Sequence, residues 1–179
     1  MIILIAGSSH TGKTLLAQSI LERYHYPYLS IDHLKMGLIR SGATDLTPED
    51  DGQLTAYLWP IVREIVKTAI ENRQNLVVEG CYIPFEWEES FEPDYLKEIR
   101  YVCLIMAQDY ISRHMDAVLL HAGAVEQRLD DIYCTVEMLL WENAASLEQC
   151  RLHGCPYVLL KDDYPADISA VWDILKIDY

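Results

Sequence analysis

Basic residues are scarce in this sequence of 179 residues, which has 14 Lys and Arg against 28 Asp and Glu and a formal net charge of −14. Nucleic acids and anionic membranes attract cationic surfaces, so this balance argues against nonspecific binding to either. We therefore expect neither a nucleic acid nor a membrane as partner. Any site for a polyanion must instead gather the few cations that the chain has.

Long apolar runs and paired cysteines are also lacking. No apolar run approaches the roughly 20 residues that cross a bilayer. The five cysteines contain no C-x-x-C pair, which indicates reduced thiols and neither a disulfide framework nor a zinc site. The six histidines show no metal spacing, and the apolar start, Met1 to Ile5, has no charged leader and indicates a first strand instead of a signal peptide. We expect a cytoplasmic protein.

One stretch near the start matches the phosphate-binding pattern G-x-x-x-x-G-K-[ST] at every position: Gly7-Ser8-Ser9-His10-Thr11-Gly12-Lys13-Thr14. It lies between an apolar run typical of a buried parallel strand, 2–6, and a helix-forming segment, 15–23. There the glycines let the backbone wrap an anion, and the N–H groups and the helix dipole point at it. Lys13 would bind the terminal phosphates, and Thr14 would ligate Mg²⁺.

Four more apolar segments predict strands, and helical patterns alternate with them. The strands are expected at 27–31, 75–80, 100–106 and 156–160, and the helices at 33–40, from Thr47 through Ala69, 108–121, 136–153 and after Pro165. Strands that alternate with helices, without a linker, predict a single three-layer α/β domain with a parallel sheet over residues 1–179. Pro60 predicts a kink or a break near Trp59, and Gly154 predicts a helix C-cap.

Acidic residues follow two of the expected strands, at the sheet edge where ligands of parallel sheets gather. Asp32 could hold Mg²⁺ through water, accept a proton from an acceptor hydroxyl, or cap the helix at 33–40. Glu79 could orient the Mg²⁺ shell, although carboxylates at strand ends are common in any case. With the phosphate loop, three separate segments thus converge on one edge.

Phosphoryl transfer needs cations that neutralise the transferred group, and the candidates are Lys13, Lys35, Arg40, Arg113 and Arg128. The span 108–131, which Gly123 interrupts, could form a mobile lid that brings arginine over the nucleotide and excludes water. Arginines on exposed helices are also commonly just solvated. The aromatic and acidic stretch 82–91 could line an acceptor pocket or pack in the core, and we expect an ordered loop at 84–93.

On its phosphate loop and the order of its elements, nearly the whole chain resembles the small P-loop kinases, which include adenylate, shikimate, gluconate and zeta-toxin-like kinases. Weaker similarities are Asp32-His33-Leu34-Lys35 to the acceptor segment, Val78-Glu79-Gly80 with Pro84 to the turn after the third strand, and 108–113 to the start of the lid. The resemblance implies a five-stranded parallel sheet of order 2-3-1-4-5, an acceptor-binding insertion at about 32–73 and a helical lid at about 108–131. It also implies that Arg113 contacts ATP and that Lys35 or Arg40 contacts the acceptor.

The expected function is Mg²⁺-assisted transfer of the γ-phosphate of ATP to a small-molecule hydroxyl or phosphate. The expected roles are catalysis by Lys13, Asp32 and Arg113; nucleotide binding by 7–14, Arg113 and Arg128; Mg²⁺ binding by Thr14, Asp32 and Glu79; and acceptor binding by Asp32, Lys35, Arg40 and Glu79.

A nucleoside monophosphate kinase is one alternative, although Lys35 replaces the usual arginine and lacks its planar fork. The other is a nucleotide-hydrolysing switch without an acceptor. Glu49-Asp50-Asp51-Gly52-Gln53 invites that comparison, but Glu49 stands at the Asp position of D-x-x-G-Q, and no N-K-x-D signature follows a later strand.

Overall fold

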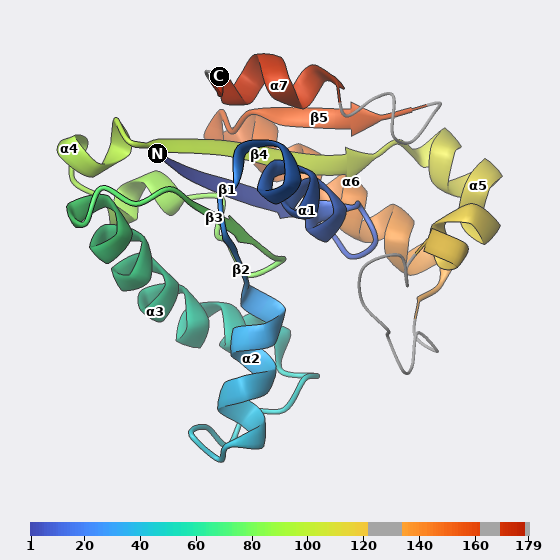
Figure 1. Cartoon of the computed structure of the whole chain (residues 1–179). Helices are drawn as coiled ribbons and strands as arrows, with labels where there is room; N and C mark the ends of the chain where they lie inside the picture. Colours follow the sequence, from blue (N-terminus) through green and yellow to red (C-terminus); the bar gives the residue numbers. More distant parts are fainter. Residues whose placement is uncertain (122–133, 162–168, 178–179) are drawn as a thin grey trace.

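Five strands form one parallel sheet in the order β2-β3-β1-β4-β5 (Figure 1). The computed structural model describes residues 1–121, 134–161 and 169–177. The strands are β1 Ile2–Gly7, β2 Tyr28–Ser30, β3 Leu76–Glu79, β4 Ile99–Met106 and β5 Tyr157–Leu160. Each lies within two residues of an expected strand. The parallel sheet and its order, which the resemblance implied, are confirmed.

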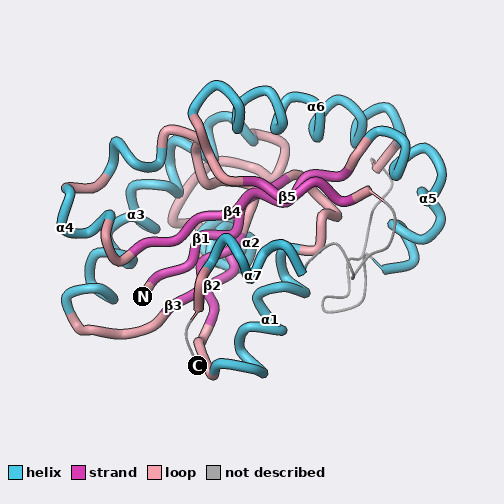
Figure 2. Tube along the Cα trace, turned by 90° about the horizontal axis from the view of Figure 1, so that it is seen from above, coloured by secondary structure: helices cyan, strands magenta, loops and turns pink. Residues whose placement is uncertain are grey.

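Helices cover both faces of the sheet. They are α1 Lys13–Tyr24, α2 Ile31–Arg40, α3 Asp51–Glu71, α4 Pro93–Leu96, α5 Gln108–His121, α6 Val136–His153 and α7 Ser169–Leu175. Figure 2 shows α3 and α6 on one side of the sheet and α1 and α7 on the other, which confirms the three-layer α/β arrangement. Within the described part of the chain, no helix has the length and apolar character that would let it cross a membrane.

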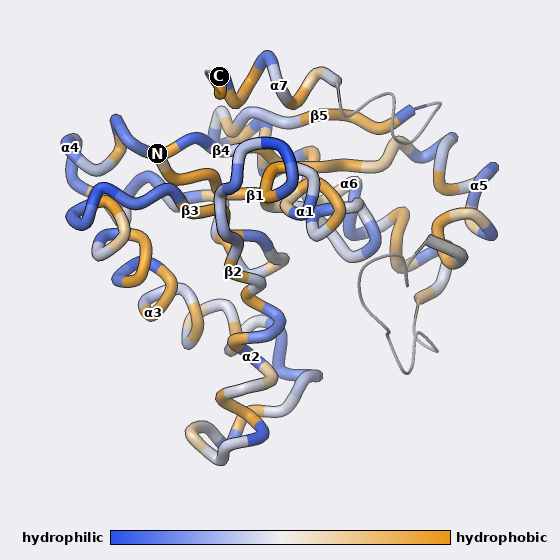
Figure 3. The backbone as a smooth tube through the Cα atoms, viewed as in Figure 1, coloured by the Kyte–Doolittle hydropathy of each residue, from blue (hydrophilic) through white to orange (hydrophobic). Residues whose placement is uncertain are grey.

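The central strand β1 is buried on both faces because consecutive side chains of a strand point to opposite sides. Ile3 and Ile5 pack in the cluster that includes α1 and α7, whereas Ile2 and Leu4 pack in the cluster that includes α3. All four side chains are completely buried. The hydrophobic colouring of the strands in Figure 3 follows from this double burial. The phosphate loop therefore begins at the end of a strand that is buried on both faces and paired on both edges.

Two of the expected helix starts are wrong. The N-cap of α2 is Ser30, so Asp32 lies inside the first turn and does not cap the helix. Helix α3 begins at Asp51 and not at Thr47, because the Asp50 carboxylate accepts hydrogen bonds from the Thr47 backbone N–H (2.8 Å) and hydroxyl (2.9 Å). Such side-chain bonds to a neighbouring backbone favour a turn over a helix. Both corrections move an acidic side chain, Asp32 or Asp51, into the first turn of its helix.

A kink or a break was expected near Trp59, and the break does not occur, since α3 continues as one helix through Pro60. The neighbours Leu58, Trp59 and Val62 are buried in the core, and their packing offsets the backbone hydrogen bond that proline cannot donate. The C-cap expected at Gly154 is confirmed, with φ of 68°.

The expected loop at 84–93 contains a short 3-10 helix, Trp87–Ser90, and leads into α4. Trp87 packs in the core and stacks on Tyr101 with a ring-centroid distance of 5.4 Å.

Helix α5 confirms the helix expected after the fourth strand, and it is interrupted at His114, where φ is −126° and ψ is 21°. The remainder of the expected lid, with Gly123 and Arg128, lies outside the described residues.

Candidate functional site

The phosphate loop curls between the end of β1 and the start of α1. Three of its residues have positive φ angles: Gly7 at 141°, His10 at 64° and Gly12 at 84°. Gly7 lies so close to β4 that a Cβ atom there would stand 2.4 Å from the Leu104 carbonyl oxygen. This curled backbone is the conformation in which consecutive N–H groups surround an anion. The glycines of the motif thus adopt backbone conformations that other residues rarely adopt.

Replacing Gly7 by alanine should destabilise the protein. The positive φ alone costs a non-glycine residue about 1–3 kcal/mol, and the overlap with Leu104 adds to that cost. Gly37 is the matched control, because it lies in α2 with no atom within 4 Å of an added Cβ. Gly37→Ala should stabilise the protein by about 0.5–1 kcal/mol. Urea unfolding of both variants tests this, and equal stabilities would contradict the close approach at Gly7.

Lys13 is buried beneath the loop, with only 5% of its surface exposed. Its Nζ donates a hydrogen bond to the Ser8 carbonyl oxygen at 2.7 Å, and the Thr11 hydroxyl donates to the same oxygen at 2.9 Å. Burial alone would lower the pKa of Lys13, but the neighbouring Cys81, Glu79 and Asp32 outweigh it and leave the pKa raised. A charged ammonium is therefore present where a polyphosphate would bind.

Asp32 and Glu79 lie beside this ammonium, at the carboxyl ends of neighbouring strands. Glu79 ends β3, is 1% exposed and pairs in register with Ser30 of β2. Asp32 follows in the first turn of α2 and forms an ion pair with Lys35 (2.8 Å between Oδ1 and Nζ). The structure thus brings together three residues that the sequence placed on one sheet edge, Lys13, Asp32 and Glu79.

Oxygen donors suitable for Mg²⁺ come from Thr14, Asp32 and Glu79, since this ion prefers carboxylates and hydroxyls. Across the described ranges, no three His, Cys, Asp or Glu side chains assemble a complete metal cage. Mg²⁺ commonly keeps several waters and binds through substrate phosphates and one or two carboxylates. The donor set beside the loop fits an ion held in that way.

A cavity of about 920 Å³ opens next to the loop. Its walls come from the loop residues 6–9, from α2, from the start of α3, from the segment after β3 and from α6. Among the expected acceptor residues, Asp32, Lys35 and Arg40 line it, whereas Glu79 is buried and is not one of its lining residues. Cavities of a few hundred to about 1,000 Å³ hold small molecules.

Tyr82 joins two walls of the cavity. Lys35 Nζ donates to the Tyr82 hydroxyl at 2.9 Å, and that hydroxyl donates to Asp51 Oδ1, also at 2.9 Å. Burial and the hydrogen bond to Asp51 raise the pKa of Tyr82, so the hydroxyl stays protonated. Both possibilities for the aromatic stretch are realised, since Tyr82 and Phe85 line the cavity and also pack with the core, whereas Trp87 packs in the core only.

Helix α6 contributes residues that the sequence did not single out. The Ser146 hydroxyl is 3.1 Å from the Ser8 hydroxyl, which joins α6 to the loop. Trp141 and Glu142 line the cavity, and Trp141 is 73% exposed. Burial raises the pKa of Glu142, as does the charge of Asp51, while the Ser9 N–H and the charge of Lys13 oppose the shift. The sequence held one indication that α6 contributes to the site, since Trp141 lies outside the apolar stripe of this helix.

The raised pKa of Glu142 predicts a pH-dependent stability. The folded state holds the Glu142 proton more tightly than the unfolded state, so this group lowers stability as pH rises above the unfolded value of about 4.3. Glu142→Gln should therefore raise the melting temperature at neutral pH, and the difference should vanish toward pH 4. Thermal unfolding from pH 4 to 8 tests this, with Glu148→Gln, an exposed change on the same helix, as control. A difference independent of pH would contradict it.

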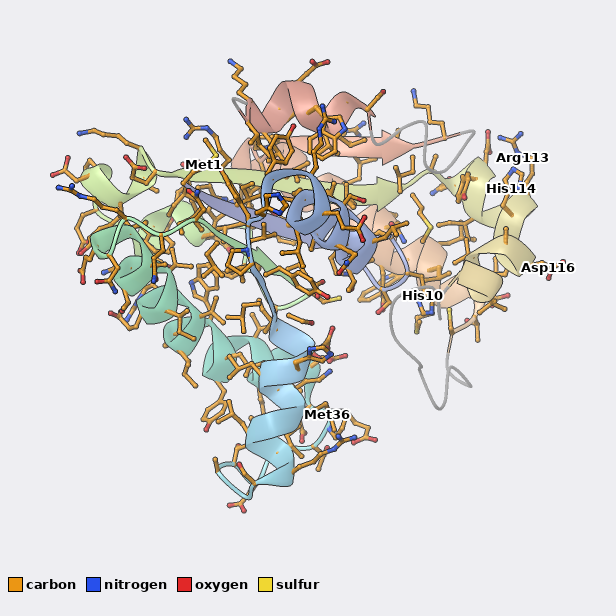
Figure 4. All side chains as sticks on the ribbon, viewed as in Figure 1. Met1, His10, Met36, Arg113, His114 and Asp116 are labelled. Atoms are coloured by element: carbon orange, nitrogen blue, oxygen red, sulfur yellow. The ribbon has the colours of Figure 1, made fainter. Side chains whose placement is uncertain are left out.

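Arg113 does not line the cavity, whereas Arg40 does. Arg113 is exposed on α5, and its Nε donates to the Asp109 carbonyl oxygen at 3.0 Å. Figure 4 shows it on the outer part of α5, far from Met36 on the α2 wall. Arg40 is exposed at the cavity rim. Arg128 is outside the described residues.

Comparison with known proteins gives structural matches only, since no family model and no curated protein matches the sequence. Shikimate kinase from Bacteroides thetaiotaomicron is similar with 14% identity, a TM-score of 0.54 and 99% coverage of both chains. Deoxyadenosine kinase from M. mycoides is similar with 13% identity and a TM-score of 0.54, and the match covers 98% of this chain and 99% of that one. A gluconokinase from Sinorhizobium meliloti is similar with 18% identity and a TM-score of 0.50, and the match covers 97% of this chain and 89% of that one. The chain has the fold of the small P-loop kinases, as its resemblance implied.

Proposed function

We propose that the protein is an ATP-dependent kinase that transfers the γ-phosphoryl group to a hydroxyl of a small molecule. The observation that carries this proposal is the position of the cavity, which shares Gly7, Ser8 and Ser9 with the phosphate loop and has Asp32 in its wall. A phosphate held by the loop would face a molecule held in the cavity. Holding both partners in one orientation is the main contribution that a protein makes to phosphoryl transfer.

In the proposed reaction the acceptor hydroxyl oxygen attacks the γ-phosphorus of ATP. The new O–P bond forms while the bond to the β–γ bridging oxygen breaks, and that oxygen keeps the electron pair and leaves with ADP. Asp32 accepts the hydroxyl proton and releases it to solvent. Lys13 and the loop N–H groups stabilise the charge on the transferred group. When bound, Mg²⁺ would neutralise phosphate charge, and Thr14, Asp32 and Glu79 would hold it.

Arg113 and Arg128 are proposed, on the resemblance alone, to contact ATP from the lid. Lys35 and Arg40 are proposed to contact the acceptor, as their place in the cavity wall supports. The comparison with a D-x-x-G-Q switch gains no support, because Asp51 opens helix α3 and does not follow a strand.

The test measures ATP binding and ADP release over a panel of sugars, amino sugars, hydroxy acids and nucleoside monophosphates, with Mg²⁺ present. We expect ATP binding together with ADP release that depends on one class of acceptor. Preference for a nucleoside monophosphate would instead identify the protein as a nucleoside monophosphate kinase. Slow ADP release that no acceptor changes would overturn the proposal in favour of a switch, and a failure to bind ATP would remove its basis.

A further inference from the structure

The cavity beside the phosphate loop is acidic. Four carboxylates line it, from Asp32, Glu49, Asp51 and Glu142, against the two cations Lys35 and Arg40. An acceptor with a carboxylate or phosphate group would meet this excess of like charge, in addition to the phosphates of the donor. Like charges in a partly buried site repel each other and disfavour the ionised forms. The wall therefore suits a neutral or positively charged acceptor.

Lys35 shows how this cavity binds an ammonium group. Its Nζ lies 2.8 Å from Asp32 Oδ1, 2.9 Å from the Tyr82 hydroxyl and 5.0 Å from the centroid of the Tyr82 ring. A carboxylate and an aromatic face together hold the charge, which combines an ion pair with a cation–π contact. Because Asp32 and Tyr82 already compensate Lys35, this lysine has little attraction left for an anionic acceptor.

The α6 wall also presents an aromatic ring and a carboxylate, and Lys13, whose charge acts on Glu142, is not among the cavity-lining residues. Trp141 and Glu142 are adjacent in sequence, both line the cavity, and the indole is 73% exposed. Among the described lining residues, Lys35 and Arg40 are the only Lys or Arg side chains, and both come from α2. Exposure of the apolar indole surface to water is unfavourable, and Glu142 is ionised less readily here than in water. Both costs fall when a cation binds at this wall.

We infer that the acceptor carries a protonated amine besides the hydroxyl that receives the phosphate, as amino sugars and amino alcohols do, and that Trp141 and Glu142 bind this amine. The inference rests on the proposed kinase function and specifies its substrate class. The amine would be held at α6 while the hydroxyl reaches Asp32 on the α2 wall. The cavity volume of about 920 Å³ accommodates a molecule that spans both walls.

The test uses acceptor pairs that differ in the amine alone: glucosamine with glucose and N-acetylglucosamine, and 2-amino-1,3-propanediol with glycerol, with gluconate as the anionic member. ADP release and phosphorus NMR of the product measure transfer, and calorimetry with a non-hydrolysable ATP analogue measures binding. We expect the amine members to bind and react at least about tenfold better than their neutral partners. A preference for neutral or anionic members, with transfer observed, would overturn the inference and leave the kinase function in place.

Two variants separate recognition of the amine from a general loss of function. Glu142→Gln should weaken binding of the amine members about tenfold without weakening ATP binding, and Trp141→Ala should act in the same direction, with partial recovery in Trp141→Phe. Glu148→Gln removes the same charge from an exposed position of α6 outside the cavity lining and should change nothing. If no amine binds while ATP does, the inference is wrong. If ATP itself does not bind, the proposed function fails first.

Discussion

Lys13→Ala should lower the affinity for ATP at least about 100-fold, with the fold retained. The ammonium is charged, 5% exposed and positioned under the loop by its bond to the Ser8 carbonyl oxygen, so no other described side chain can take its place. Calorimetric titration with ATP and Mg²⁺ measures the effect. Unchanged nucleotide binding would refute the assignment of the phosphate loop.

The same change should also affect stability, for a separate reason. Removing Lys13 leaves the buried Glu79 carboxylate and Asp32 near each other without that cation, which costs about 1–3 kcal/mol. The double variant Lys13→Ala with Glu79→Gln should recover much of the melting temperature and none of the ATP affinity. This control distinguishes a lost phosphate contact from a weakened fold.

Asp32→Asn should reduce the rate of transfer by about 10²–10⁴ while ATP binding is retained. An amide cannot accept the hydroxyl proton, although it occupies the same volume. The cap of α2 is Ser30, so the alternative that Asp32 serves as a helix cap no longer accounts for its position. Steady-state kinetics with the acceptor found in the panel, together with ATP titration, measure the two effects separately.

Asp94→Asn is the matched control for Asp32. Asp94 forms an ion pair with Lys97 over the same i,i+3 spacing, at 2.7 Å compared with 2.8 Å for Asp32 and Lys35, but it is exposed and lies outside the cavity. Losing that exposed surface pair should change stability little and the kinetics not at all. Equal kinetics for the two variants would show that Asp32 is not the base.

Much of this fold could be predicted because its signals are local. Each strand is a short apolar run, and the phosphate loop is one contiguous motif whose glycines adopt the positive φ angles that their spacing requires. The convergence of Lys13, Asp32 and Glu79 followed from a general property of parallel sheets, whose strands all end at the same edge.

The features of the site that could not be predicted depend mainly on contacts between segments far apart in the chain. The helix starts at 31 and 51 were missed because Ser30 and Asp50 compete with equally suitable neighbours for the capping position. Trp141 and Glu142 were missed because α6 enters the site from more than 100 residues beyond the loop, and its polar face resembles any solvated helix. The hydrogen bonds that join Tyr82 to Lys35 and to Asp51 likewise needed the folded chain.

The two halves of the site differ in how the chain builds them, and this difference has an evolutionary consequence. The proposed donor half comes from eight consecutive residues at the end of a buried strand, whereas the cavity takes its walls from α2, α3, the segment after β3 and α6. Substitutions in the cavity walls can therefore accumulate without disturbing the loop. The shikimate, deoxyadenosine and gluconate kinases share this fold at 13–18% identity and carry the names of different substrates. A site divided in this way can acquire new acceptors by drift in its walls while its chemistry is inherited intact.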